Sequence, residues 1–470
     1  MGVADGGAMQ AFTRSTRILC CSLLAAVGCS GAASPSSLQG SDAGSDGGST
    51  GPSPEASSPE SSGGNADASP DAAVVADGCV AAVTTSTVAC TESNTSCANI
   101  IVSGDVPTSN ATGFYGYADP TARSDPASST AWMMYSWLVI QPTTGDEGGT
   151  VDPRLSENHL AQSSDEGGSW TKDEVVWPVI STTYQGEAGF LSSETAGFTS
   201  ATSGGSTLWY AIHERYFTPA LSGYNPTGQT LTVRVAQAAT LADLAGQSPS
   251  DELVLSGPGL DPAFGPSVNL SAVDGAAASA LVAACSIWHD TEIFYDQGKL
   301  YVGVECAVDD PTNAVLAVFV TTPTGAMTSW TWSLAGTLGD PSIAAEISSQ
   351  LALDPPATSM TQLNLTRGKN GQLLAVMTPT SVTQGTTDGS FTSTQVHMGN
   401  VAVQLDSLDP IAFSRDCAGH LIIPSRTTAD DEVLGTGSST YDPALTTGII
   451  LDRQPTHTTG FEMHATGLRP

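Results

Sequence analysis

Positive charge is scarce in this sequence. Its 470 residues include 14 Lys and Arg against 47 Asp and Glu, which gives a formal net charge of −33 at pH 7. A chain this acidic repels phosphate groups, which excludes nucleic acid and an anionic membrane face as partners. Carboxylate oxygens suit Ca²⁺, but the sequence contains no Asp-x-Asp-x-Asp-Gly loop. We therefore expect no cofactor and keep only Ca²⁺ open.

A membrane-spanning apolar run is missing from the amino-terminal region. The apolar segment Ile18–Val27 follows Arg14 and Arg17 and is too short to cross a bilayer. A basic region, a short apolar run and small residues at its end are the parts of a secretory signal peptide. We therefore predict a signal peptide over residues 1–28 and an exported protein.

The end of this segment carries a lipidation signal. Residues 24–29 read Leu-Ala-Ala-Val-Gly-Cys and resemble a bacterial lipobox, in which the cysteine, here Cys29, is acylated and becomes the new amino terminus. The alternative is ordinary cleavage after Gly28 or Gly31. The resemblance implies a lipoprotein at the cell surface or in the periplasm, attached to the membrane by its lipid anchor alone.

Aromatic and basic side chains are absent from residues 30–78, which consist almost wholly of Ser, Gly, Ala, Asp, Pro and Glu. Such a segment cannot bury enough apolar surface to offset its chain entropy. We predict that residues 29–78 comprise the lipidated cysteine and a disordered tether. Because no second linker of this composition follows, residues 79–470 are expected to form a single domain.

Catalytic thiols are not expected, although the chain has nine cysteines. Three of them, Cys20, Cys21 and Cys29, belong to the export segment. An even number of the rest in an exported chain indicates disulfides. Residues 296–298 read Asp-Gln-Gly, a turn signal between two apolar runs, and folding this hairpin brings Cys285 and Cys306 to its open end. We predict that these two are bonded. The pairing of Cys79, Cys90, Cys97 and Cys417 stays open.

Windows that favour a helix are few after the tether. Leu241–Ala245 and Ile343–Leu353 are the better candidates, whereas short apolar or alternating runs closed by Gly, Asn, Asp or Pro recur along the rest. The run Trp132–Ile140 is apolar on both faces and predicts a strand buried between layers. The sequence therefore predicts an all-β fold, either a sandwich or a propeller.

One turn motif favours the propeller. Ser163, Asp165, Gly167, Ser169 and Trp170 form the pattern Ser-x-Asp-x-Gly-x-Ser-Trp, which resembles the Asp-box of sialidases and related β-propellers. The aspartate can accept backbone N–H bonds across a tight turn, the glycine can take a left-handed conformation and the tryptophan can pack between blades. The resemblance implies a sialidase-like propeller, and the length fits five to seven blades, with six favoured. In that superfamily the motif lies opposite the active site, so it implies little about chemistry.

Propellers place functional side chains at the starts of their innermost strands. One such segment, Tyr115–Pro126, contains Tyr117, Arg123 and Asp125. An Asp-Pro pair ahead of an aromatic strand is similar to the opening blade of arabinanase and fructosidase propellers, which implies Asp125 as base or nucleophile. Arg123 can hold a substrate carboxylate, with Tyr117 as a further substrate contact. The alternative is that Asp119 and Asp125 merely form turns, as Asp-Pro commonly does.

A second acidic segment runs from residue 286 to 295. Asp290 and Glu292 lie on the same face of an extended chain, and Trp288 offers a flat surface on which a sugar can stack, with His289 beside it. A carboxyl group near an apolar ring can have a raised pKa and act as a general acid. The glycosidase resemblance implies Glu292 rather than Asp290 as this acid. The alternative is an acidic strand edge beside a core tryptophan.

Other catalytic signatures are missing. The chain has no Arg-Ile-Pro start of the sialidase kind and no Gly-x-Ser-x-Gly elbow, and its seven histidines are too scattered to predict a metal site. The leading hypothesis is an exported propeller that acts on extracellular carbohydrate as a glycoside hydrolase, with Asp125 and Glu292 as its pair of carboxyl groups. The alternative is a non-catalytic propeller that binds glycan or protein.

Overall fold

The computed structural model describes residues 80–470 except for short segments of the chain. These are residues 91–96, 111–113, 141–142, 145–149, 152, 185, 204–205, 221–231, 248–250, 257–266, 270–272, 274–279, 282–283, 286, 308–313, 388–389, 429–435 and 455–459. The predicted signal peptide, Cys29, the tether and Cys79 lie outside the described residues. Within the described part, no helix has the length and apolar character needed to cross a membrane.

The fold is nearly all β, as the sequence predicted. β5 (Ala131–Ile140) contains the run expected to be buried on both faces. It lies between β4 (Gly116–Ser124) and β8 (Arg154–Ser163), and most of its side chains are buried. The helix α2 (Pro341–Leu351) covers most of one predicted helical window. It begins there because the Asp340 carboxylate accepts N–H bonds from Ser342 at 2.9 Å and Ile343 at 3.1 Å.

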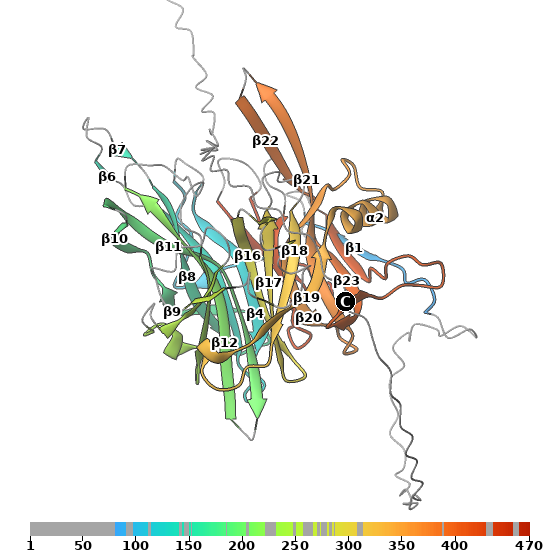
Figure 1. Cartoon of the computed structure of the whole chain (residues 1–470), viewed down its shortest axis with the longest axis horizontal. Coiled ribbons are helices and arrows are strands. Elements are labelled where there is room, and N and C mark those ends of the chain that lie inside the picture. Colours follow the sequence, from blue (N-terminus) through green and yellow to red (C-terminus); the bar gives the residue numbers. More distant parts are fainter. Residues whose placement is uncertain are drawn as a thin grey trace, which may run out of the picture. The chain divides into compact units, whose positions relative to one another are not determined.

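Four sheets each take their main strands from one continuous stretch of chain (Figure 1). The first has the order β3 (Val102–Ser103), β9 (Trp170–Trp177), β8 (Arg154–Ser163), β5 and β4 (Gly116–Ser124). The second has the order β10 (Ile180–Tyr184), β11 (Glu187–Ser203), β12 (Ser206–Pro219), β13 (Thr232–Ala238), β14 (Leu253–Ser256) and β15 (Ser267–Asn269). The third has the order β16 (Ile287–Asp296), β17 (Lys299–Ala307), β18 (Val315–Thr321) and β19 (Trp332–Gly339).

The fourth sheet is larger and includes a strand from the beginning of the described chain. Its order is β1 (Ser86–Ala89), β25 (Ser425–Thr428), β23 (Val401–Leu408), β21 (Leu373–Thr387) and β20 (Ser359–Arg367). Two further strands pair onto it, β22 (Ser390–His397) with β21 and β24 (Ile411–Phe413) with β23. β6 (Thr143–Thr144) and β7 (Thr150–Val151) form a separate two-stranded ribbon.

A last sheet joins the two ends of the described chain. Its order is β2 (Ala98–Ile100), β28 (Glu462–Ala465), β27 (Ile450–Arg453) and β26 (Thr436–Thr440). The arrangement of small sheets is propeller-like. Four blades come from continuous stretches of the chain, and β2 pairs with β28 to complete the additional sheet. The expected count of five to seven blades, with six favoured, is not confirmed, because chain length alone does not show how many strands each sheet takes.

One strand of each of these five sheets lies at the axis. β4 lies beside β11 and β26, β11 beside β16, β16 beside β20, and β20 beside β26, so the inner strands close a ring. Separate hydrophobic clusters fill the spaces between neighbouring sheets. Met134 and Leu160 of the first sheet, for example, pack with Phe198 and Trp209 of the second. This packing fixes the inner strands around one axis.

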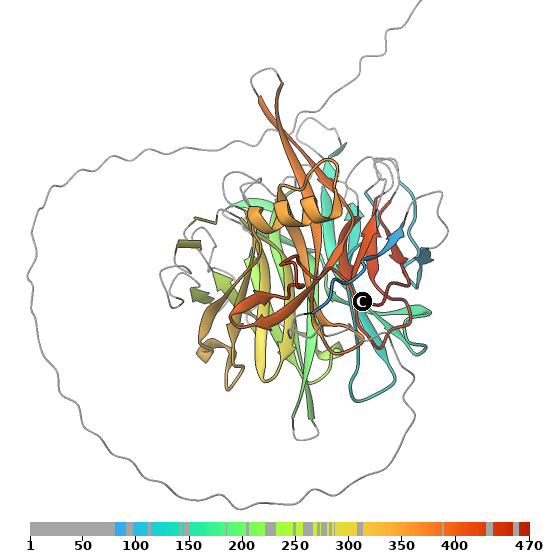
Figure 2. The same ribbon diagram turned by 90° about the vertical axis from the view of Figure 1, so that its right-hand side faces the viewer.

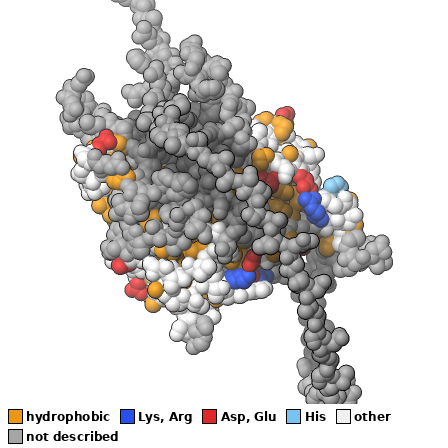
Figure 3. Space-filling model, viewed as in Figure 1, with side chains coloured by type: hydrophobic (Ala, Val, Ile, Leu, Met, Phe, Trp, Pro, Cys, Tyr) orange, Lys and Arg blue, Asp and Glu red, His pale blue; other side chains and the backbone are white. Residues whose placement is uncertain are grey.

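Several hairpins extend beyond the sheets. Figures 1 and 2 both show the β21–β22 hairpin projecting past its neighbours at the end that also carries α2. The base of this hairpin holds His397, whose surroundings include Asp290. The surface seen in Figure 3 carries scattered acidic side chains and few basic ones.

The predicted disulfide between Cys285 and Cys306 is present, with the two Cα atoms 5.3 Å apart. A second disulfide joins Cys90 to Cys97. Cys417 is disulfide-bonded as well.

Candidate functional site

The inner strands break their regular pairing at corresponding places. Asp119 of β4, Thr195 of β11, Asp290 of β16 and Gln362 of β20 all have φ between 49° and 51°. Each lies where the register with the next strand shifts. A non-glycine residue in this left-handed region costs on the order of 1 kcal/mol and re-aims its side chain, and such bulges are common beside active sites. The strain is thus concentrated around the axis.

These bulges surround a pocket at the axis. All the inner strands contribute to its lining, and hydroxyl and carboxyl side chains predominate. The lining residues are Asp119, Pro120, Thr121, Thr195, Ala196, Asp290, Thr291, Glu292, Gln362, Leu363, Ser438 and Ser439.

Asp119 is held in place by hydroxyl groups from two other strands. Its carboxylate accepts hydrogen bonds from Ser136 Oγ at 2.9 Å and Ser438 Oγ at 2.7 Å. Its backbone N–H donates to Asp452 Oδ2 at 2.7 Å. Burial, together with the negative charge of Asp290, raises the pKa of Asp119 to about 6.

Asp290 has a different environment. Its carboxylate oxygen Oδ2 lies 3.2 Å from His289 Nδ1, and its backbone N–H donates to the Glu214 carboxylate. Burial raises the pKa of Asp290, but the adjacent His289 outweighs burial, so the pKa is lowered overall. Two carboxyl groups that line one pocket are therefore shifted in opposite directions.

Further carboxyl groups lie behind these two. Glu214 accepts a hydrogen bond from Thr195 Oγ1 at 2.6 Å, and burial with the charge of Asp290 raises its pKa to about 7. Burial raises the pKa of Glu305 to about 8, and it raises the pKa values of Glu194 and Asp452 well above the ordinary range. Within the described residues, none of these carboxyl groups is bonded to a Lys or Arg side chain. Among the described residues, the pocket is thus surrounded by acids without a Lys or Arg partner, and His289 is the positively chargeable group beside them.

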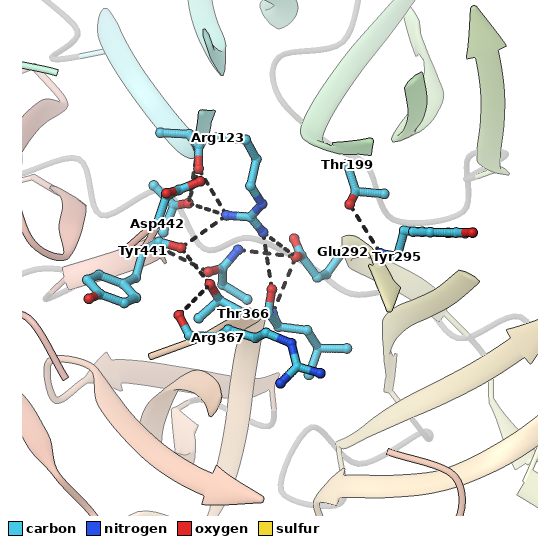
Figure 4. A network of polar contacts seen from close by, with 12 residues as sticks. Arg123, Thr199, Glu292, Tyr295, Thr366, Arg367, Tyr441 and Asp442 are labelled. Atoms are coloured by element: carbon cyan, nitrogen blue, oxygen red, sulfur yellow. Dashed lines mark hydrogen bonds and ion pairs between the residues drawn. The ribbon is translucent and has the colours of Figure 1, made fainter. Parts of the chain in front are cut away.

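One lining residue of the pocket, Glu292, belongs to a buried ion pair (Figure 4). Arg123 Nη2 lies 2.9 Å from Glu292 Oε1, and both residues are buried. Glu292 Oε1 also accepts hydrogen bonds from Asn364 Nδ2 at 3.1 Å and from Leu365 N at 3.3 Å. Arg123 Nη1 donates to Thr440 Oγ1 at 3.1 Å. Burial raises the pKa of Glu292 to about 7, although the charge of Arg123 opposes this rise.

This network corrects two sequence-based roles. Arg123 was expected to hold a substrate carboxylate and Glu292 to act as the general acid, but each is already occupied by the other. Asp125 does not join them, because it lies in the turn after β4, where its carboxylate accepts from Ala127 N at 2.9 Å and Ser128 Oγ at 2.8 Å. The turn-forming alternative describes Asp125. Asp119, in the other Asp-Pro pair of the same segment, is the aspartate that lines the pocket.

The expected aromatic contacts also lie elsewhere. Trp288 is 1% exposed and packs near Phe319 in the core, so it offers no stacking surface. Tyr117 is 1% exposed, and its hydroxyl donates to Asp105 O at 2.5 Å. Both residues are structural in this arrangement because their strands turn the rings between sheets. His289 does lie beside the pocket, where it contacts Asp290.

The Ser-x-Asp-x-Gly-x-Ser-Trp motif forms the turn between β8 and β9. Asp165 Oδ1 accepts hydrogen bonds from Ser163 Oγ at 2.7 Å and from Ser169 N at 2.9 Å. Gly167 has φ of 88°, and Trp170 is buried in the core. The local geometry is the one expected for such a turn. Membership of the Asp-box superfamily stays a prediction.

One group of described residues could be tested as a metal site. Ligand atoms of His289, Asp290 and Glu305 lie within 4.8 Å of one another. His289, however, uses Nδ1 for Asp290 and Nε2 for Glu305, at 3.2 Å and 3.4 Å. Because the two ring nitrogens point in different directions, this arrangement is a chain of ion-pair contacts rather than a chelate.

Sequence reasoning missed Asp119, Glu214, Glu305 and Asp452 as members of the site. The last three come from β12, β17 and β27, which are not innermost strands, so no motif at the start of an inner strand could reveal them. Asp290 was among the candidates because it precedes a strong strand. The Asp-Pro signal at Asp119 was visible, but it did not distinguish Asp119 from Asp125.

No family model matches the chain, and no curated protein matches it by sequence. Among solved structures, the chain is similar to a family 117 glycoside hydrolase of the marine bacterium Zobellia galactanivorans, with a TM-score of 0.39, 12% identity and coverage of 71% of this chain and 75% of that one. It is similar to a family 43 arabinoxylan arabinofuranohydrolase from Bacillus subtilis, with a TM-score of 0.37, 14% identity and coverage of 76% and 63%.

An exo-inulinase from Aspergillus awamori gives a TM-score of 0.39, 11% identity and coverage of 76% of this chain and 63% of that one. These neighbours are glycoside hydrolases by name. Because the sequence identities and TM-scores are this low, we infer nothing about the function of this chain from these similarities.

Proposed function

We propose that this chain is an exported protein that hydrolyses a glycosidic bond in the axial pocket. One observation carries the proposal: Asp119 and Asp290, from two different sheets, line one pocket and have pKa values shifted in opposite directions. Glycoside hydrolysis needs two such groups, because one carboxyl group must donate a proton while the other stays ionised to attack or to activate water.

The environments assign the two roles. Asp290, which is kept ionised beside His289, is the base or nucleophile. Asp119, with a pKa of about 6, is protonated at mildly acidic pH and acts as the general acid. Activity should therefore decline as the pH rises above about 6, because Asp119 then loses the proton that it donates. This assignment replaces Asp125 and Glu292 by Asp119 and Asp290.

The rest of the pocket suits a sugar. Thr121, Thr195, Thr291, Ser438 and Ser439 bring hydroxyl groups to the lining, and Gln362 adds an amide. Such groups can donate to and accept from the hydroxyl groups of a carbohydrate. The substrate class is therefore an extracellular carbohydrate or glycoconjugate.

One observation favours the second candidate, a propeller that binds glycan or protein without cleaving it. Glu292 lines the pocket, yet its carboxyl group is engaged by Arg123, Asn364 and Leu365. A binding protein needs no free acid, so this saturation fits it well. In that case Asp119 and Asp290 serve only as hydrogen-bond acceptors for the ligand.

Export and anchoring belong to the same proposal. The predicted signal peptide and the lipobox-like sequence ending at Cys29 support a lipoprotein at the cell surface or in the periplasm. The motif from Ser163 to Trp170 supports kinship with sialidase-like propellers. Incorporation of labelled fatty acid into the chain, with its loss in Cys29→Ser, tests the anchor.

A hydrolysis assay over a broad panel of aryl glycosides and oligosaccharides tests the central role. We expect the purified chain to cleave one class, and Asp290→Asn and Asp119→Asn each to lower kcat by roughly 10² to 10⁴-fold. The matched control is Asp125→Asn, which changes the same residue type in the turn after β4 and should leave kcat unchanged.

Glycan-array binding by the same proteins separates the two candidates. If no glycoside is hydrolysed while Asp290→Asn still binds a glycan like the unaltered chain, the binding function replaces hydrolysis. If neither hydrolysis nor glycan binding is found, the carbohydrate proposal fails.

A further inference from the structure

His289 connects the pocket to a carboxyl group buried behind it. It pairs directly with Glu305 in the register of β16 with β17, and the bulge at Asp290 begins immediately after it. His289 Nδ1 lies 3.2 Å from Asp290 Oδ2, and His289 Nε2 lies 3.4 Å from Glu305 Oε1. One imidazole ring therefore touches a carboxyl group that lines the pocket and another that does not.

Glu305 is more deeply buried than either partner. It is 3% exposed, and its second oxygen, Oε2, has no hydrogen-bond partner among the described residues. A buried carboxylate oxygen without a donor is costly, whereas a protonated carboxyl group can use that side as a donor. Asp290 is the acceptor within its reach, and a bond from Glu305 contributes to the lowered pKa of Asp290.

Charge balance favours the same arrangement. A protonated His289, an ionised Asp290 and a protonated Glu305 together carry no net charge, whereas an ionised Glu305 would add a negative charge to an acidic, buried region. Other titratable groups face Asp290 from the elements packed around it. They are Asp119 of β4, Glu194 of β11, Glu214 of β12, His397 of β22 and Asp452 of β27.

We propose that Glu305 and His289 are positioning residues that clamp the Asp290 carboxylate, so that it stays ionised and aimed into the pocket. The role of this clamp in catalysis rests on the proposed function of Asp290. The geometry of the clamp and the protonation of its members do not depend on that function. His289 was expected to contact substrate directly. In this assignment it acts through Asp290.

The molecule contains a matched arrangement away from the pocket. His159 lies between Asp105 and Glu157, with Nδ1 in contact with Asp105 and Nε2 3.0 Å from Glu157 Oε1. Here Lys172 Nζ supplies a positive charge 2.8 Å from Asp105 Oδ1. Although burial opposes it, the histidine holds the pKa of Glu157 below its ordinary value. This cluster can therefore carry two ionised carboxylates, and Glu157→Gln is the control for a substitution at Glu305.

The first test is a titration of the unaltered chain, selectively labelled with ¹⁵N-histidine and followed by NMR. His289 should remain an imidazolium at pH 7, because Asp290 and Glu305 both contact it. A neutral His289 ring at pH 6 would overturn the clamp. This readout needs no substrate, so it stands whether or not the chain hydrolyses glycosides.

Variants at Glu305 give the second test. Glu305→Ala should lower the pKa of His289. It should also move the acid limb of the plot of kcat/KM against pH to higher pH, because the pKa of Asp290 rises when the clamp is lost. Glu305→Gln, whose amide can still donate to Asp290 and accept from His289, should restore the position of that limb. Glu157→Gln should leave both the His289 resonance and the limb in place.

Two results would contradict the proposal. A uniform loss of activity in Glu305→Ala, with an unmoved acid limb and an unmoved His289 resonance, would show a merely structural role. A shift of the His289 resonance on adding Zn²⁺ or Ca²⁺, reversed by EDTA, would show that the three side chains bind a metal ion instead. If no activity is found but His289 titrates as expected, the clamp stands and the hydrolase proposal fails.

Discussion

The buried carboxyl groups of this molecule belong to two kinds of region. Glu292 at the pocket and Glu252 each face an arginine, at 2.9 Å from Arg123 and 3.0 Å from Arg234. The other carboxyl groups around the pocket have no arginine partner among the described residues. Burial raises the pKa of Asp119, Glu214 and Glu305, and it raises the pKa of Glu292 too, although there the charge of Arg123 opposes it. We call a buried acid compensated when a basic side chain pairs with it, and uncompensated when none does. Compensated acids are typical of structural ion pairs, whereas uncompensated acids with shifted pKa values are typical of functional sites. The contrast agrees with the proposed roles of Asp119 and Asp290, which have no arginine partner among the described residues.

The largest effect should follow from breaking the compensated pair. Arg123→Met leaves Glu292 buried without its cation, so we expect the free energy of unfolding to fall by about 3–5 kcal/mol. Urea denaturation measures this loss. Arg415→Met is the matched control, because Arg415 pairs with Glu346 at 2.5 Å on the surface and such pairs are worth less than about 1 kcal/mol. Equal losses in the two variants would remove the distinction between the buried and the exposed pair.

A smaller effect should appear at low pH, where the compensated acids lose their charge. Burial opposes the shift, but His159 and Lys172 bring the pKa of Asp105 down to about 2. A carboxyl group with a folded pKa below its unfolded value contributes stability above about pH 4, and this contribution is lost as the pH falls through 2.

Asp105→Asn should therefore cost about 2 kcal/mol at pH 7 and almost nothing at pH 2. Thermal or urea unfolding at a series of pH values measures the difference. A pH-independent cost would mean that Asp105 acts through packing rather than through its charge.

An uncompensated acid should show the opposite sign. The folded pKa of Asp119 is about 6, above that of the unfolded chain, so its ionisation destabilises the fold as the pH rises from about 4 to 6. We expect Asp119→Asn to raise the free energy of unfolding by about 3 kcal/mol at pH 8 and to change it little at pH 4. A loss of stability at pH 8 would place Asp119 with the compensated groups. The same substitution should remove activity, which separates stability from function.

The sequence predicted features that depend on local contacts. The hairpin at residues 296–298 identified the Cys285–Cys306 disulfide because both cysteines lie at its open end. The apolar run in β5 predicted a buried strand, and the window from Ile343 predicted most of α2. Each of these depends on a short stretch of chain, so spacing and residue type are sufficient.

The site could be predicted only in part, because it depends on how distant strands meet. Asp290 was a candidate, but the bulge that aims it at the axis leaves no mark of glycine or proline in the sequence. Arg123 and Glu292 are 169 residues apart, and their pairing follows from the closing of the inner strands into a ring. Asp119 and Asp125 both precede a proline, and nothing local shows which of them lies within the inner strand. Asp125 was therefore predicted from the sequence, although Asp119 is the one that lines the pocket.

The central claim is that Asp119 and Asp290 share a pocket in opposite protonation states. Carboxyl ¹³C NMR titration of the chain labelled at aspartate, with resonances assigned through Asp119→Asn and Asp290→Asn, measures this directly. The account predicts that Asp119 titrates near pH 6 and that the pKa of Asp290 lies below its ordinary value. Titration of both groups together near pH 4 would contradict it.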